Sequence, residues 1–238
     1  NGRIYLSKLF YKKILKLDFI KIKKILPKGV NLLAVSKGFK SSDIEYMQSL
    51  GQIDFGESKV QEAMQKPVFQ IDNNLIWHFI GRIQTNKIRK IVKHFDFIHS
   101  VDSYKKLLKI SEVAIELQKI PNVFIQVKLA KDPEKAGFSY AELMANWDQI
   151  KQIKGIKING LMTINPKGLN AESNLELFNK CRLIADNLEL PDCSMGMSND
   201  WEEAIKAGST WIRLGSLIFG QRYSSVSYTH LTLPTILL

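Results

Sequence analysis

The chain has 238 residues, of which 45% are hydrophobic and 24% are charged, and its formal net charge is +11. These values are typical of a globular protein with one large domain, and they exclude a low-complexity chain. No apolar run approaches the roughly 20 residues that span a bilayer, so we expect no membrane partner. The two cysteines, Cys181 and Cys193, have neither a CxxC nor a metal-type spacing. Their pattern favours a reducing, cytoplasmic setting with both thiols in the core or near a functional site.

The positive charge is concentrated at the beginning of the chain. Residues 1–30 contain nine basic residues and one acid, and therefore carry +8 of the net charge. Apolar residues recur there at helical spacing, which predicts a basic amphipathic helical segment over residues 1–26, with its helix within residues 4–25. Packing on the domain is one interpretation of this segment, and contact with RNA or a membrane surface is the other. Because the remaining residues carry only +3, we expect no nucleic-acid partner for the domain itself.

From residue 28 onwards, short apolar runs alternate with turns and helical segments. We expect strands at 31–36, 53–55, 76–80, 96–100, 122–128, 157–162, 191–195 and 210–214. We expect helices near 41–50, 57–66, 85–94, 103–119, 139–153, 174–188 and 198–207.

Eight alternating strands and helices predict an α/β protein with a single (β/α)8 TIM barrel over residues 27–223, preceded by the extra N-terminal helix. A doubly wound open sheet is the alternative, but no GxGxxG motif follows the first strand. Residues 224–238 contain no Lys, Arg, Asp or Glu. This break in composition predicts a tail that is disordered or not native to the protein.

Lys37 follows the apolar run 31–36, at the position where a barrel strand would end. A lysine there can lose part of its hydration, which lowers its pKa and leaves a neutral amine able to attack a carbonyl. The usual carbonyl partner is the aldehyde of pyridoxal phosphate (PLP), held as a Schiff base. The alternative is a solvated residue at the end of a strand, and Lys37 alone does not decide between the two.

Two segments after the seventh and eighth predicted strands have residues suited to a phosphate site. Gly196 and Ser198 lead into a predicted helix, and Gly215 with Ser216 follows the last strand. Backbone N–H groups and hydroxyls at such places bind anions, and the last two strands of a barrel commonly build a phosphate site. Helix capping by Ser198 and an ordinary turn at Gly215 are the alternatives. Two such segments on successive strands favour phosphate.

Arg213 lies inside the last apolar run, where a guanidinium is costly unless it meets an anion or a hydrogen-bond acceptor. It could bind phosphate, or face a ring nitrogen and keep that nitrogen unprotonated, or form a structural ion pair. Met197 could pack on a flat ring. His78 could be an acid–base group, but within a strand we expect a hydrogen-bonded core residue.

Together these motifs resemble the YggS/PROSC family of pyridoxal phosphate homeostasis proteins. The resemblance covers most of the chain, from Pro27 to Arg222. It rests on Leu33–Lys37, Phe55–Ser58, Val60–Glu62, Trp77–Gly81, Gln84, Asn86–Lys87, Lys135–Gly137, Gly160–Thr163, Ser194–Ser198, Asp200, Arg213–Gly215 and Ile218–Gly220. The family usually has Asn in place of Ser58, which puts a contact with the cofactor hydroxyl in doubt. Ser216 replaces a usual threonine and keeps the hydroxyl.

The resemblance implies a barrel like the N-terminal domain of alanine racemase, with PLP at the ends of the strands. It implies that Lys37 is the Schiff-base lysine and that Arg213 faces the pyridine nitrogen. It also implies that Ser198, Gly215 and Ser216 form the phosphate cradle. The expected cofactor-binding residues are Lys37, Ser58, Met197, Ser198, Arg213, Gly215 and Ser216. We expect no catalytic residues and no metal ligands.

The implied function is that of a binding protein that holds PLP for intracellular homeostasis and delivery, without efficient turnover. PLP-dependent apoenzymes are the expected partners, and a monomer is the expected state. The alternative is a racemase-like enzyme acting on amino acids. Racemisation needs an acid–base group on each face of the substrate's α-carbon, and Lys37 supplies one face only. Alanine racemase takes its opposing tyrosine from a second domain, and no tyrosine stands in the motifs above, which favours binding without turnover.

Overall fold

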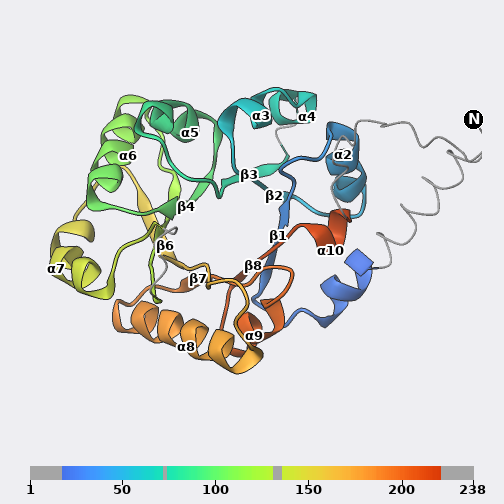
Figure 1. Cartoon of the computed structure of the whole chain (residues 1–238). Helices are drawn as coiled ribbons and strands as arrows, with labels where there is room; N and C mark the ends of the chain where they lie inside the picture. The colour runs from blue at the N-terminus through green and yellow to red at the C-terminus, as the bar shows by residue number, and fades with distance from the viewer. Residues whose placement is uncertain (1–17, 72–73, 131–135, 221–238) are drawn as a thin grey trace, which may run out of the picture.

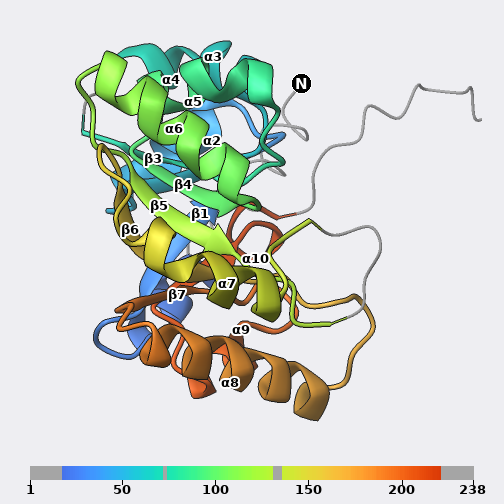
Figure 2. The same ribbon diagram turned by 90° about the vertical axis from the view of Figure 1, so that its left-hand side faces the viewer.

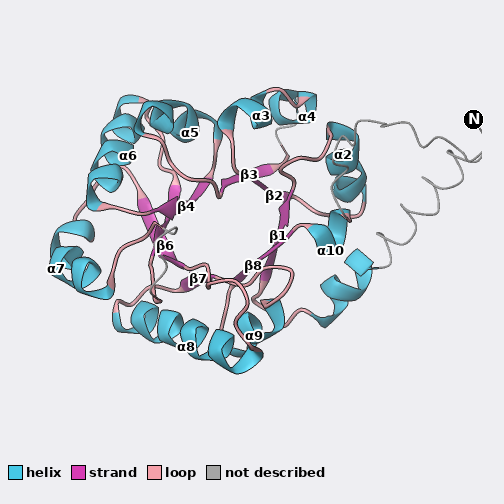
Figure 3. Cartoon of the chain, viewed as in Figure 1, coloured by secondary structure: helices cyan, strands magenta, loops and turns pink. Residues whose placement is uncertain are grey.

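The computed structural model describes residues 18–71, 74–130 and 136–220. Within them, eight parallel strands close a barrel in the order β1 to β8, and helices form a ring around it (Figures 1 and 3). The strands are β1 (Asn31–Val35), β2 (Asp54–Glu57), β3 (Ile76–Phe79), β4 (Phe97–Val101), β5 (Asn122–Gln126), β6 (Lys157–Met162), β7 (Asp192–Ser194) and β8 (Trp211–Leu214). The (β/α)8 barrel that the sequence predicts is confirmed.

The helical elements between the strands lie close to their predicted positions. They are α2 (Ser41–Ser49), α3 (Val60–Met64), α4 (Pro67–Ile71), η1 (Thr85–Lys87), α5 (Ile88–His94), α6 (Tyr104–Glu116), α7 (Tyr140–Ile150), α8 (Ala171–Asn187), α9 (Trp201–Lys206) and α10 (Ser216–Phe219). No helix among the described residues has the length and apolarity to cross a membrane.

Three details differ from the sequence prediction. The helix expected at 57–66 is the shorter α3, and α4 beyond it was not predicted; Pro67 cannot continue α3 but suits the first position of α4. Ser198 does not cap the following helix, since α9 begins at Trp201 with Asp200 at its N-cap. The single-turn helix α10, directly after β8, was not predicted.

Part of the N-terminal helix lies in the described structure. Residues 18–25 are helical, and Phe19 and Ile22 are buried against the barrel's helices and strands. The remainder of the predicted segment 1–26, and the predicted tail 224–238, lie outside the described residues. The interpretation of this helix as packed on the domain is confirmed for its last two turns.

The barrel strands are buried on both faces, as parallel strands usually are. Their outer faces share one apolar cluster with the surrounding helices. A second, smaller cluster of Leu33, Phe124, Met162 and Trp211 fills the barrel interior. Cys181 and Cys193 are buried free thiols.

Two histidines also lie inside the barrel. His78 stacks on Phe97 with ring centroids 4.4 Å apart, and His99 stacks on Phe124 at 4.3 Å. Burial lowers the pKa of both imidazoles, and that of His99 most, so both rings are neutral at neutral pH. The interpretation of His78 as a hydrogen-bonded core residue is confirmed.

Pairing between the first and last strands closes the barrel. Leu33 lies opposite Arg213, and Ala34 lies opposite both Leu214 on β8 and Phe55 on β2. The carboxyl ends of these three strands therefore meet at one end of the barrel. In Figure 2, the arrow of β5 points toward the side on which α10 lies, so α10 marks the same end. Active sites in this fold generally lie at that end of the barrel.

Candidate functional site

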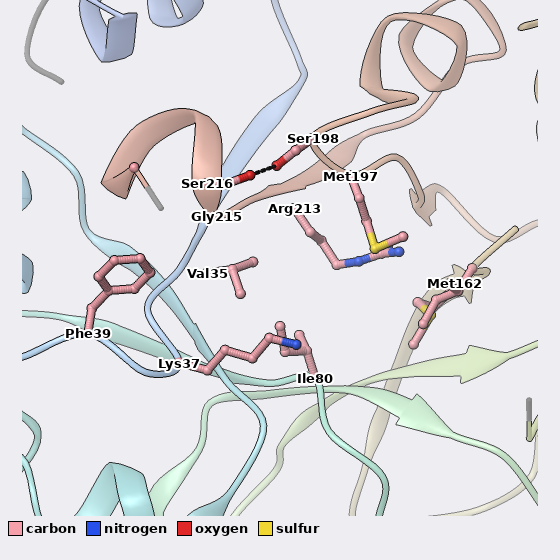
Figure 4. Close-up of a pocket in the computed structure, with 12 residues that line it drawn as sticks. Val35, Lys37, Phe39, Ile80, Met162, Met197, Ser198, Arg213, Gly215 and Ser216 are labelled. Atoms are coloured by element: carbon pink, nitrogen blue, oxygen red, sulfur yellow. Dashed lines mark hydrogen bonds between the residues drawn. The ribbon is translucent and has the colours of Figure 1, made fainter. Parts of the chain in front are cut away.

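A cavity of about 330 Å³ opens at the carboxyl end of the barrel (Figure 4). It is lined by Val35, Lys37, Phe39, Ile80, Met162, Ile164, Met197, Ser198, Arg213, Gly215, Ser216 and Gly220. Six of the seven residues that the sequence predicts for the site are among these, and they come from the ends of β1, β7 and β8. The structure thus brings together residues that are up to 179 positions apart.

Lys37 lies on the turn that follows β1, and its half-buried side chain points into the cavity (Figure 4). Both of its chain neighbours are held by carboxylates from the next βα unit. The Ser36 hydroxyl donates to Glu57 Oε1 at 2.6 Å, and the backbone N–H of Gly38 donates to Glu62 Oε1 at 2.5 Å. The turn that carries Lys37 is therefore fixed on either side of the amine.

A buried ion pair completes this support. Lys66 Nζ lies 2.5 Å from Glu57 Oε1 and donates to the carbonyl oxygen of Ser36 at 2.9 Å. The side chains of Glu57 and Lys66 are 0% and 8% exposed. Burial raises the pKa of Glu57, while the charge of Lys66 and hydrogen bonds from Lys66 and Ser36 oppose that rise. The sequence analysis did not predict that Glu57, Glu62 and Lys66 support the site, although the two glutamates stand in the motifs that carry the family resemblance.

The predicted phosphate segments meet at one edge of the cavity. The Ser216 hydroxyl donates to the Ser198 hydroxyl over 3.2 Å, as the dashed line in Figure 4 shows. The turn before Ser198 is ordered by the Met197 N–H, which donates to the Asp200 carboxylate at 2.6 Å. Two hydroxyls and the start of α10 therefore face the same edge.

The two glycines of these segments differ in what they require. Gly196 has a φ of +91°, and a Cβ there would lie 2.5 Å from the Cβ of Ala204, so folding itself requires glycine. Gly215 has a φ of −116°, and a Cβ there would make only ordinary contacts at 3.5 Å with Val35. Packing of the protein therefore tolerates a methyl group at 215, where it would occupy the wall of the cavity.

Arg213 is 4% exposed, and its guanidinium reaches the cavity beside Met197 and Met162 (Figure 4). Nη1 donates to the Ser194 hydroxyl and Nη2 to the Thr163 carbonyl oxygen, each at 2.9 Å. Burial lowers the pKa of Arg213 to about 10, against the opposing charge of Asp200. The guanidinium is still a cation at neutral pH, and it presents a fixed positive charge to the cavity.

Ser58 is the predicted residue that the structure places elsewhere. It lines a second cavity of about 420 Å³, together with Gly81, Arg82 and Lys87 among others. A Cβ on Gly81 would lie 1.9 Å from the Ser58 carbonyl oxygen, so glycine is what allows the ends of β2 and β3 to approach. A contact between Ser58 and a cofactor hydroxyl stays a prediction.

The donors and walls of the first cavity suit a flat apolar ring that carries an anionic group. Val35, Ile80 and Met162 are apolar walls, while the paired hydroxyls and two cations supply polar contacts at its edges. Of the described residues that line this cavity, Lys37 and Arg213 alone have titratable side chains. These described residues supply one amine nucleophile and no second acid–base group.

Comparison with known proteins agrees with this geometry. The family model for the alanine racemase N-terminal domain matches residues 15–223. The pyridoxal phosphate homeostasis protein of Synechocystis sp. is 42% identical over 205 residues, which cover 83% of this chain and 94% of that protein. The chain belongs to the pyridoxal phosphate homeostasis protein family. The member from Pseudomonas aeruginosa is 39% identical over 198 residues, covering 82% of this chain and 86% of its own.

Solved structures show the same relationship. A structure of the family member PipY from Synechococcus elongatus, with PLP bound, superposes with a TM-score of 0.83 at 40% identity. The match covers 87% of this chain and 100% of that one. Alanine racemase from Clostridium difficile is 15% identical with a TM-score of 0.72, and this chain covers 59% of it. That second likeness shows the fold alone.

Replacing Lys66 by methionine should destabilise the protein by about 3 kcal/mol, because the Glu57 carboxylate is left buried without its charged partner. Urea unfolding measures this change, and amide exchange at Gly38 should become faster as the turn loosens. The matched control is Lys180→Met, since Lys180 and Glu176 form a pair that is 54% and 65% exposed. Losing that exposed pair should have a much smaller effect, because solvent screens it. Equal effects of the two substitutions would contradict the role given to the buried pair.

Proposed function

We propose that this chain binds pyridoxal 5'-phosphate reversibly and serves its intracellular homeostasis and delivery. The observation that carries the proposal is the convergence of Lys37 with Ser198, Gly215 and Ser216 on one cavity. The names of its relatives, and the PLP bound in PipY, support the same ligand. We further propose that the protein acts in the cytoplasm as a monomer and that PLP-dependent apoenzymes receive the cofactor.

Lys37 is the amine in this proposal. When bound, PLP supplies an electrophilic aldehyde and an electron-withdrawing ring. Lys37 would hold PLP through a C=N bond between its Nζ and the aldehyde carbon, a Schiff base whose formation releases one water molecule. Hydrolysis of that bond would take up one water molecule and restore the free lysine, as a delivery function requires. The carboxylates that hold Ser36 and Gly38 keep the amine directed into the cavity.

The phosphate and the ring would meet different residues. Ser198 and Ser216 offer hydroxyl donors to the phosphate, and Gly215 leaves room for it beside the backbone. Arg213 would face the ring nitrogen as a cation that only donates hydrogen bonds. A neighbouring cation disfavours protonation of that nitrogen, which keeps the ring a weaker electron sink.

A carrier differs from a racemase in needing no second acid–base group opposite Lys37. Among the described residues that line the cavity, none could protonate a substrate carbon on the face opposite Lys37. We therefore propose that the protein binds PLP without efficient turnover. The loaded protein should racemise L-alanine no faster than free PLP does, measured by chiral chromatography. Racemisation at ordinary enzymatic rates would favour the alternative, a racemase-like enzyme.

Replacing Lys37 by alanine should abolish the visible imine absorbance and weaken PLP binding about 100-fold, which corresponds to about 2.7 kcal/mol. Absorbance spectra and equilibrium dialysis measure the two effects. Lys40→Ala is the matched control, because Lys40 is an exposed lysine on the same β1–α2 connection, at the N-cap of α2. A Lys37→Ala variant that still formed a borohydride-reducible imine would overturn the assignment.

Replacing Gly215 by alanine should leave the free energy of unfolding within about 1 kcal/mol of wild type, because the new methyl group meets only ordinary contacts. The same methyl group should lower the affinity for PLP about tenfold, since it fills space beside the phosphate. Pyridoxal, which lacks the phosphate, should bind both proteins alike. An equal loss for the two ligands would argue against a phosphate at this edge.

A further inference from the structure

A continuous chain of hydrogen bonds crosses the barrel interior behind the cavity. Arg213 Nη1 lies 2.9 Å from Ser194 Oγ, which lies 2.8 Å from His99 Nδ1. His99 Nε2 lies 2.9 Å from His78 Nδ1, and His78 Nε2 lies 3.0 Å from Asp54 Oδ1. This hydrogen-bond chain thus joins β8, β7, β4, β3 and β2 through their side chains.

The two ends of this chain lie at opposite ends of the barrel. Arg213 lines the cavity at the carboxyl end, whereas Asp54 is the first residue of β2. Ser194, His78 and His99 are fully buried, and the Asp54 side chain is 18% exposed. Solvent therefore reaches the chain at the end remote from the ligand.

Donor and acceptor rules give the chain one direction. Arg213 only donates, and the Asp54 carboxylate only accepts. With neutral imidazoles, His78 must carry its proton on Nε2 to face Asp54, so its Nδ1 accepts from His99 Nε2–H. His99 Nδ1 is then an acceptor, and it takes the single proton of the Ser194 hydroxyl. The Ser194 oxygen is then free to accept a hydrogen bond from Arg213. If every donor and acceptor were reversed, the unprotonated Nε2 of His78 would face the Asp54 carboxylate, and the two would repel each other.

Burial of both rings, together with the charges around His99, favours this neutral state. Asp54 and Asp96 act on His78 in favour of a proton, but burial acts against it. His78 and Arg213 both act on His99 against a proton, in addition to burial. A proton on His99 would place a second buried cation one hydroxyl away from Arg213. It would also turn Nδ1 into a donor and displace the Ser194 proton.

We propose that Asp54, His78, His99 and Ser194 are positioning residues that hold the Arg213 guanidinium toward the cavity. Hydrogen bonds in such a series polarise one another, so the donor–acceptor direction set at Asp54 also determines the direction at Ser194. A neutral hydroxyl whose proton is already committed is a fixed acceptor, and it holds the guanidinium without neutralising its charge. These hydrogen bonds explain how the cavity keeps an oriented cation in a buried place.

The proposed hydrogen-bond chain can be tested on the protein without any ligand. Long-range ¹⁵N–¹H NMR should find His78 and His99 as Nε2–H tautomers that stay neutral from pH 7 to 5.5. Half-buried His94 on α5 lies outside these hydrogen bonds and provides the reference signal. Arg213 should show separate Nη signals, because its guanidinium rotates slowly. In Asp54→Ala, the His78 tautomers should become mixed and the Arg213 signals should merge. Asp192→Ala is the matched control, because Asp192 also opens a strand but lies outside the chain.

A second readout rests on the proposed function. Asp54→Ala should weaken PLP binding about three- to tenfold and shift the visible absorbance maximum, although Asp54 does not line the cavity, whereas Asp192→Ala should change neither. Wild-type affinity and spectrum in Asp54→Ala, or Nδ1–H tautomers in the wild type, would overturn the positioning chain. A wild-type protein without PLP binding would overturn the proposed function instead, and the ligand-free NMR result would still decide the chain.

Discussion

Parallel pairing between β1 and β8 closes the barrel and joins residues from the two ends of the chain in one site. Register pairs from Asn31 with Trp211 to Ala34 with Leu214 align the two strands so that they end side by side. The turn that carries Lys37 therefore follows β1 at the place where Gly215 and Ser216 follow β8. A shift of one residue in this register would turn Arg213 away from the interior, because side chains alternate between the faces of a strand. The site is thus a consequence of barrel closure.

Buried charge is the feature that sets this site apart from the rest of the core. The Glu57–Lys66 pair and Arg213 are all nearly inaccessible to solvent, and burying such groups costs free energy that apolar side chains would not. The structure offsets this cost with specific partners, among them the Ser36 hydroxyl, the Ser194 hydroxyl and the Thr163 carbonyl. In return, an amine and a guanidinium are held on opposite sides of one small cavity. Rigid placement of an amine and a guanidinium suits the proposed binding of an anionic aldehyde.

Much of the fold could be read from the sequence because barrel strands are short apolar runs between turns. Lys37, Ser198, Gly215 and Ser216 were also predictable, since the ends of strands in a barrel share one mouth. The supports of the site were not predictable in the same way. The contacts of Lys66 with Ser36, and of His99 with Ser194, depend on side-chain directions and on strand register across the barrel. Helix α10 is a single turn, too short to leave a periodic pattern, and Ser58 lines a neighbouring cavity that its position at a strand end does not reveal.

The central claim is that one particular lysine holds the cofactor. The direct test is to load the protein with PLP, reduce it with borohydride, digest it and locate the modified residue by mass spectrometry. The account predicts one pyridoxyl group per chain on the peptide that contains Lys37, with Lys66 and the exposed lysines unmodified. Modification spread over many lysines, or centred on a lysine other than Lys37, would contradict the account.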